Sequence, residues 1–183
     1  CLPEGSQSLS TMKDTIMKPD IIIYTDGSCL NNGSEFAPGG WAAVLENDSK
    51  QLRVSGRECP TTNQRMELTA ILEGLKAVQG TGKAICIYTD SSYARNGCNE
   101  WRHNWKKNGW KKSDKKPVEN LDLWKQLDEL LEQHEVKLFK VKGHSGHPQN
   151  DLADSMAVAA AHGQTVNEYR RVGDYQFDWR DHA

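Results

Sequence analysis

Two segments with nearly the same ending, IIIYTDGS at residues 21–28 and AICIYTDSS at residues 84–92, decide the fold of this chain. Each begins with an apolar, largely β-branched run and ends in turn-forming residues, as a buried strand does where it enters a loop. Residues 63–79 between them, NQRMELTAILEGLKAVQ, repeat apolar side chains with a helical period. Strand, helix and strand predict a parallel crossover, in which both strands end at the same edge of the sheet. We therefore expect Asp26 and Asp90 to face each other.

The rest of the pattern predicts one α/β domain with a five-stranded mixed sheet flanked by helices. After the first strand, strands at 41–46 and 51–57 continue an antiparallel meander, and a strand at 136–141 is the fifth. Further helices are expected at 91–98, 100–108, 119–134 and 149–162. The last residues, 163–183, contain turn formers without a clear period, so no conformation is predicted for them.

Composition excludes several classes of protein. No apolar stretch of the 183 residues approaches the roughly 18 that span a bilayer, so we expect no membrane segment. The first residues lack the basic and then apolar pattern of a secretory signal, and we expect a cytoplasmic location. The five cysteines are widely spaced and never form a CxxC pair, which argues against a disulfide framework and against a zinc site.

A single basic segment stands out from an acidic chain. Residues 101–116, WRHNWKKNGWKKSDKK, hold seven basic side chains and one acidic, whereas the other 167 residues hold 16 basic and 24 acidic. Such a charge density attracts phosphates, and tryptophan stacks on bases or sugars without reading sequence. The alternative is a solvated amphipathic helix with tryptophans in the core.

Carboxylates are predicted to converge at the shared sheet edge. Asp26 and Asp90 would repel each other there unless they share a proton or bind a divalent cation. At about 100° per residue, Glu67 lies on or beside the buried stripe of its helix, where an unpaired carboxylate is costly. The alternative for Glu67 is a salt bridge with Arg65 or Lys76.

The last predicted helix offers two further acids. Asp151 lies near the amino end of this helix, where the helix dipole favours an acid, so its presence needs no functional explanation. Asp154 lies in line with Ala157, Val158 and Ala161 and is expected to point toward the body of the protein. Four inward acids on separate elements predict a divalent-metal site, consistent with phosphoryl transfer by two ions about 3.5 to 4 Å apart.

Several motifs in the same order resemble those of bacterial-type ribonuclease H, type 1, over residues 21–162. They are YTDGSC at 24–29, TTNQRMEL at 61–68, TDS at 89–91, the segment 101–118 and VKGHSGHP at 141–148. The resemblance implies the RNase H-like fold. It implies a catalytic domain at 20–162 with a basic protrusion at 101–118. Residues 1–19 are polar and show no period, which predicts a flexible lead-in, and 163–183 are expected to be a C-terminal extension.

The resemblance further implies an endoribonuclease that hydrolyses the RNA strand of RNA/DNA hybrids and leaves 5′-phosphate and 3′-hydroxyl ends. It implies two Mg²⁺ ions, with Mn²⁺ as a substitute, and the removal of RNA primers and R-loops during DNA replication. The fold needs no obligatory protein partner, so we expect a monomer. The family's metal-binding catalytic carboxylates fall on Asp26, Glu67, Asp90 and Asp154, and its loop histidine on His144. This choice selects Asp154 over Asp151.

The contacts with the hybrid are also carried over by position. The set implied by the resemblance and the basic segment is Asn32, Thr62, Asn63, Gln64, Tyr93, Trp101, Trp105, Lys106, Lys107, Trp110, Lys111, Lys112, Ser113 and Asn120. The chain departs from the family pattern in a longer loop at 30–38 and in Pro60, where some relatives use an arginine for phosphate. The alternatives are a resolvase-type or integrase-type enzyme, a catalytically silent hybrid-binding module, and a detached ribonuclease H domain of a reverse transcriptase.

Overall fold

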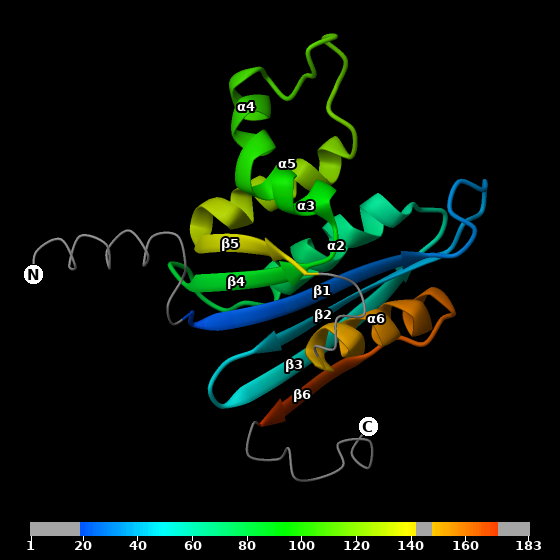
Figure 1. Ribbon diagram of the computed structural model, residues 1–183, viewed down its shortest axis with the longest axis vertical. Helices are drawn as coiled ribbons and strands as arrows, with labels where there is room; N and C mark the ends of the chain where they lie inside the picture. The colour runs from blue at the N-terminus through cyan, green and yellow to red at the C-terminus, as the bar shows by residue number, and fades with distance from the viewer. Residues whose placement is uncertain (1–18, 142–147, 172–183) are drawn as a thin grey trace, which may run out of the picture.

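The computed structural model describes residues 19–141 and 148–171, which form a twisted mixed sheet with helices on both faces (Figure 1). Across the sheet the strand order is β5-β4-β1-β2-β3-β6. The strands are β1 (Ile21–Cys29), β2 (Gly39–Glu46), β3 (Lys50–Glu58), β4 (Ala84–Thr89), β5 (Glu135–Lys140) and β6 (Asn167–Arg171). Strands β1, β4 and β5 are parallel, whereas β1, β2, β3 and β6 follow one another antiparallel.

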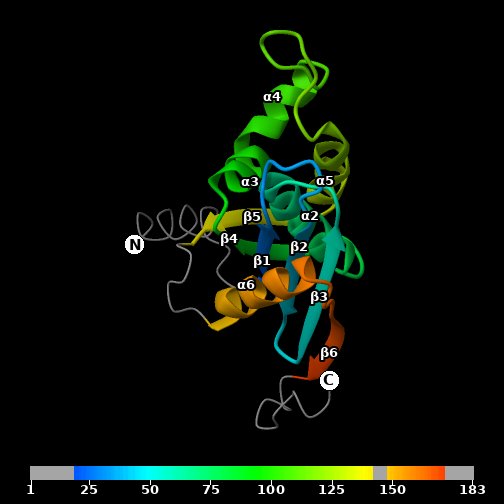
Figure 2. The ribbon, with the colours of Figure 1, turned by 90° about the vertical axis from the view of Figure 1, so that its right-hand side faces the viewer.

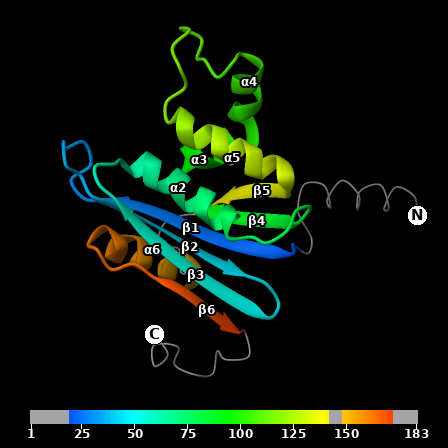
Figure 3. The same cartoon turned by 180° about the vertical axis from the view of Figure 1, so that it is seen from behind.

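The helices divide between the two faces of the sheet. They are α2 (Asn63–Lys76), α3 (Ser92–Asn96), the π-helical turn η1 (Gly97–Trp101), α4 (Arg102–Lys107), α5 (Leu121–Gln133) and α6 (Pro148–Ala161). Helix α6 lies over β1, β2 and β3, and α2 and α5 cover the opposite face (Figures 1 and 3). Helix α4 and the loop after it project away from the sheet (Figure 2). In the two described ranges, no helix is long and apolar enough to cross a bilayer.

The number of strands differs from our prediction of five, because β6 adds a sixth. It pairs antiparallel with β3, from Lys50 opposite Arg171 to Val54 opposite Asn167. The segment NEYRR has no alternation of apolar and polar side chains, so its sequence carries no strand signal. It becomes a strand because the edge of β3 offers backbone hydrogen-bonding groups. Part of the predicted C-terminal extension therefore belongs to the sheet.

The predicted crossover is confirmed. Strand β1 pairs in parallel with β4, from Ile21 opposite Ile85 to Tyr24 opposite Tyr88. Continued by two residues, this register brings Asp26 beside Asp90. The sequence pattern thus located the edge of the sheet at which the two aspartates meet.

Two clusters of buried side chains hold the layers together. On the α2 and α5 face, the larger cluster includes Ile23, Ile71 and the fully buried Trp124. Under α6 the cluster is smaller and built from Ala42, Val44, Ala153, Met156 and Ala157. Because most of these side chains are small, α6 approaches the sheet closely, which brings its polar face near the end of β1.

Candidate metal centre and nucleic-acid interface

Three acidic side chains meet at the carboxyl end of β1 and β4. Asp26 comes from β1, Glu67 from the second turn of α2 and Asp90 from the residue after β4. One carboxylate oxygen from each lies within 4.8 Å of the others. Asp26 is buried, Glu67 is partly buried and Asp90 is exposed, so the group opens to solvent on one side.

Helix α6 brings the fourth predicted acid to the same place. Hydrogen bonding with the Asp154 carboxyl contributes to the raised pKa of Asp26, so Asp154 faces Asp26, although it is not one of the three residues whose oxygens lie within 4.8 Å of one another. Asp151, one turn earlier, is exposed in the first turn of α6. The helical spacing and the close packing of α6 on the sheet together explain why Asp154 joins the cluster.

The electrostatics of the cluster favour a bound cation. Burial, followed by hydrogen bonding with Asp154 and the charge of Asp90, raises the pKa of Asp26 to about 8. Burial and the charges of Asp26 and Asp90 also raise the pKa of Glu67 well above its ordinary value. Burial and the neighbouring charges thus disfavour the ionised forms of Asp26 and Glu67, and a divalent cation would remove this cost.

The surroundings of Glu67 fit a metal ion. Its Oε2 atom is buried with no hydrogen-bond partner among the described residues. The alternative prediction, a salt bridge from Glu67 to Arg65 or Lys76, is wrong. Arg65 pairs with Asp122 at 2.9 Å and Lys76 pairs with Glu73 at 3.2 Å. An orphaned carboxylate oxygen beside two aspartates is a donor set suited to Mg²⁺ or Mn²⁺.

The position of the predicted histidine falls in a segment that the structure does not describe. His144 belongs to residues 142–147, which are outside the described residues. The strand that precedes it, β5, ends at Lys140 next to β4, and α6 follows at Pro148.

At the start of α2, several predicted contact residues lie together. Thr62 caps the helix, and its hydroxyl accepts a hydrogen bond from the Arg65 backbone N–H at 3.2 Å. The backbone N–H of Asn63 donates to Asn32 Oδ1 at 3.2 Å, which ties the 30–38 loop to the helix. Gln64 is exposed beside them. This end of α2 is therefore a polar surface with hydroxyl and amide groups turned to solvent.

A second polar group joins α2, α3 and α5. The Tyr93 hydroxyl accepts hydrogen bonds from Asn120 Nδ2 at 3.3 Å and from Trp124 Nε1 at 3.1 Å. Arg65 Nη1 donates to Asn120 Oδ1 at 3.3 Å, and the same guanidinium holds Asp122. Sequence reasoning missed this role of Arg65, because the contact joins residues 55 positions apart.

The tryptophans of the basic segment are unequally exposed. Trp101 is 38% exposed, whereas Trp105 and Trp110 are partly buried against the core. Trp101 contacts the rings of Tyr93 and Trp105, with centroids 6.2 and 6.0 Å away. Two tryptophans therefore pack inward, as the amphipathic-helix alternative expects, and one is presented to solvent.

The basic side chains also divide into two kinds. Arg102 is buried and pairs with Asp128 at 2.6 Å and with Glu132 at 2.8 Å, so it anchors α4 to α5. Lys106 lies 3.1 Å from the same Asp128, and Lys112 lies 3.7 Å from Glu119. The remaining lysines of the segment are exposed, as is Ser113; they are Lys107, Lys111, Lys115 and Lys116.

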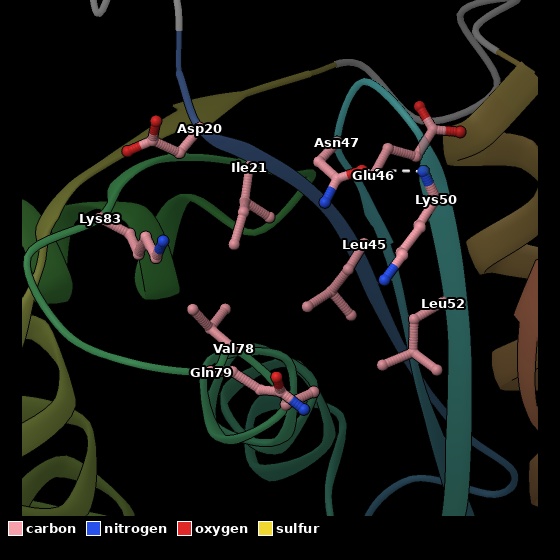
Figure 4. Close-up of a pocket in the computed structure, with 11 residues that line it drawn as sticks. Asp20, Ile21, Leu45, Glu46, Asn47, Lys50, Leu52, Val78, Gln79 and Lys83 are labelled. Atoms are coloured by element: carbon pink, nitrogen blue, oxygen red, sulfur yellow. Dashed lines mark hydrogen bonds between the residues drawn. The ribbon is translucent and has the colours of Figure 1, made fainter. Parts of the chain in front are cut away.

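A cavity of about 380 Å³ lies at the opposite end of β1 from the carboxylates (Figure 4). Its walls come from Ile21, Leu45 and Val78, with Lys50 and Lys83 at its rim. None of the four carboxylates lines it. The cavity is therefore separate from the candidate metal centre.

Comparison with known proteins agrees with this geometry. The RNase H family model matches residues 18–162. Ribonuclease H of Pseudoalteromonas atlantica is 51% identical over 146 residues, which cover 80% of this chain and 93% of that protein. Ribonuclease H of Rhodopseudomonas palustris strain BisB5 is 48% identical over 141 residues, covering 77% and 91%. The crystal structure of LC9-RNase H1, a type 1 RNase H with the type 2 active-site motif, has a TM-score of 0.73 at 35% identity and covers 84% of this chain and 80% of that one.

Proposed function

Because the chain belongs to the RNase H family, we propose that it hydrolyses the RNA strand of RNA/DNA hybrids and leaves 5′-phosphate and 3′-hydroxyl ends. The observation that carries the proposal is the meeting of Asp26, Glu67 and Asp90 within 4.8 Å, with Asp154 against Asp26. A protein that only bound an anionic duplex would gain nothing from these carboxylates beside it.

In this proposal Asp26, Glu67, Asp90 and Asp154 would hold the metal ions. When bound, two Mg²⁺ ions, or Mn²⁺ in their place, supply a water of lowered pKa and stabilise the charge of the departing 3′-oxygen. Because burial raises the pKa of Asp26 to about 8, this carboxyl would give up its proton where a cation binds, so loading would be favoured at higher pH.

The chain's own residues distinguish RNA from DNA and handle protons. The Glu67 carboxylate is proposed to accept a hydrogen bond from a ribose 2′-hydroxyl, the group that DNA lacks. His144 is proposed to move a proton or to assist departure of the product, as a histidine can near neutral pH. Neither role requires base-specific contacts, so cleavage is expected over many sequences.

The hybrid is proposed to lie across the start of α2 and the basic protrusion. Thr62 and Asn120 would meet a DNA phosphate, and Asn32, Asn63 and Gln64 would contact the minor groove. Tyr93, Trp101 and Ser113 would line the channel of the DNA strand, and Trp105, Lys106, Lys107, Trp110, Lys111 and Lys112 would complete the surface. The 38% exposure of Trp101 supports a stacking contact there.

At the level of the whole chain, we propose a catalytic domain at 20–162 that acts as a monomer and removes RNA primers and R-loops during replication. Residues 1–19 would be a lead-in, and 163–183 an extension of which β6 pairs with the edge strand β3 of the sheet. A cytoplasmic location belongs to the same proposal.

The test is cleavage of four end-labelled duplexes, RNA/DNA, RNA/RNA, DNA/DNA and DNA/DNA with one ribonucleotide, with Mg²⁺ and with EDTA. We expect metal-dependent cutting confined to the RNA strand of the hybrid. Tight binding of the hybrid without cutting would point to a silent binding module. Cutting of DNA/DNA would point to a resolvase-type or integrase-type enzyme.

A further inference from the structure

Gly27, directly after Asp26 in β1, lies against the backbone of α2. A Cβ atom at this position would lie 2.4 Å from the Glu67 backbone nitrogen and 2.5 Å from the Met66 carbonyl carbon. Both are main-chain atoms, which cannot turn aside as the end of a flexible side chain can. The φ angle of Gly27 lies outside the left-handed region, so the lack of space alone excludes a side chain here.

The backbone N–H of Gly27 adds a second, independent link. It donates to Asp26 Oδ1 at 2.9 Å, and the same backbone group lies near enough to the Glu67 carboxyl to oppose the larger effects that raise the pKa of Glu67. One donor is therefore shared between two of the proposed metal ligands, one on the sheet and one on the helix. A hydrogen bond to a carboxylate also favours its ionised form, the form that binds a cation.

We propose that Gly27 is a positioning residue of the metal centre: its missing side chain lets α2 approach β1, and its N–H holds Asp26 and Glu67 at the separation that a divalent ion requires. This inference rests on the proposed metal centre. It assigns to Gly27 no contact with the substrate and no part in the chemical step.

The same pair of elements offers a matched control in Gly74. Gly74 lies on α2 about two turns after Glu67, and a Cβ atom there would lie 3.1 Å from Ile23 Cγ2 and 3.3 Å from Ala43 Cβ. These are tight contacts with side-chain methyl groups, which yield by a few tenths of an ångström. Gly74→Ala therefore crowds the same helix and strand far from the carboxylates.

The experiment titrates Mn²⁺ into Gly27→Ala, Gly74→Ala and the wild type by calorimetry, without nucleic acid. We expect Gly27→Ala to bind Mn²⁺ at least about tenfold more weakly than the wild type, because the ligands are no longer held in position. Gly74→Ala should remain within about twofold of the wild type. Hybrid binding in EDTA, measured on the same proteins, is expected to stay within about twofold for both variants, because phosphate contacts lie elsewhere. Equal Mn²⁺ affinity in Gly27→Ala and wild type, or equal weakening in both variants, would overturn the proposal.

If Gly27→Ala does not fold, hydrogen exchange of the Gly27 amide in Glu67→Ala gives the answer. We expect its exchange to accelerate at least about tenfold relative to the wild type, since a hydrogen-bond acceptor is lost. Unchanged exchange would contradict the shared donor. Failure of the wild type to cleave hybrids while it still binds Mn²⁺ would refute the proposed function and leave the role of Gly27 intact.

Discussion

The carboxylate cluster and the basic protrusion are both charged, but the structure builds them in opposite ways. The cluster draws one acid from each of four elements, β1, α2, the end of β4 and α6, and its central member Asp26 is buried. The protrusion is one continuous segment whose lysines are mostly exposed. Its loop is closed by main-chain bonds such as Trp110 N–H to Trp105 O at 2.6 Å.

This difference follows from what each region has to do. A metal ion needs several oxygens at fixed distances, so every ligand must be positioned by rigid, packed elements. A phosphate backbone needs only charge at moderate range, which flexible lysines on the surface supply. We therefore expect changes in the cluster to abolish function and changes in the protrusion to weaken binding in small, salt-dependent steps.

The largest effect is expected from Asp26→Asn. Removing this central carboxylate should lower Mg²⁺-dependent cleavage of the hybrid by at least about a thousandfold, because a ligand of the proposed metal centre is lost. Hybrid binding should be retained, because the variant leaves the protrusion intact. Single-turnover cleavage and filter binding measure the two quantities. Asp151→Asn is the control and should cleave normally; activity in Asp26→Asn would contradict the metal assignment.

The same substitution should stabilise the metal-free protein at alkaline pH. Because the pKa of Asp26 rises from 3.8 to about 8 on folding, its contribution to stability is fully present below about pH 4 and is lost as the pH rises toward 8. In EDTA at pH 9, Asp26→Asn should raise the free energy of unfolding on the order of 2 kcal/mol. Urea unfolding at pH 5 and pH 9 measures this, and an equal difference at both pH values would contradict it.

In the protrusion, the double variant Lys107→Ala with Lys111→Ala should weaken hybrid binding by about tenfold near 0.1 M salt. The slope of log Kd against log salt should fall by about 2, one unit for each lost phosphate contact. Cleavage at saturating hybrid should be unchanged. Lys125→Ala on α5, also exposed, is the control, and the same loss there would show that only the net charge matters.

The smallest effect is expected from Trp101→Ala. Loss of one stacked ring should weaken hybrid binding by about fivefold without changing the salt slope, since stacking releases no counterions. Val158→Ala on α6 removes a side chain of similar exposure, 39% against 38%, and should have no effect. A changed salt slope in Trp101→Ala would indicate that the ring acts through the neighbouring lysines.

Local patterns predicted the parts of the molecule that depend on short stretches of chain. The repeated strand endings predicted that Asp26 and Asp90 lie at one edge of the sheet, and helical spacing predicted that Glu67 and Asp154 point inward. In the structure Asp26, Glu67 and Asp90 lie together, and Asp154 faces Asp26. These signals are visible because a strand or helix repeats its burial every two or 3.6 residues. The family resemblance then chose Asp154 over Asp151.

Contacts between distant segments carried no such signal. Strand β6 forms because the edge of β3 is available for pairing. Arg65 of α2 forms an ion pair with Asp122 of α5, and Arg102 of α4 forms one with Asp128 of α5. From the sequence, Gly27 is explained by the turn that follows the strand, and its close contact with the backbone of α2 depends on the tertiary structure. Which side chains come into contact across the fold depends on how whole helices and strands pack against one another. This packing is determined by many small contacts throughout the core, so no short stretch of sequence encodes it.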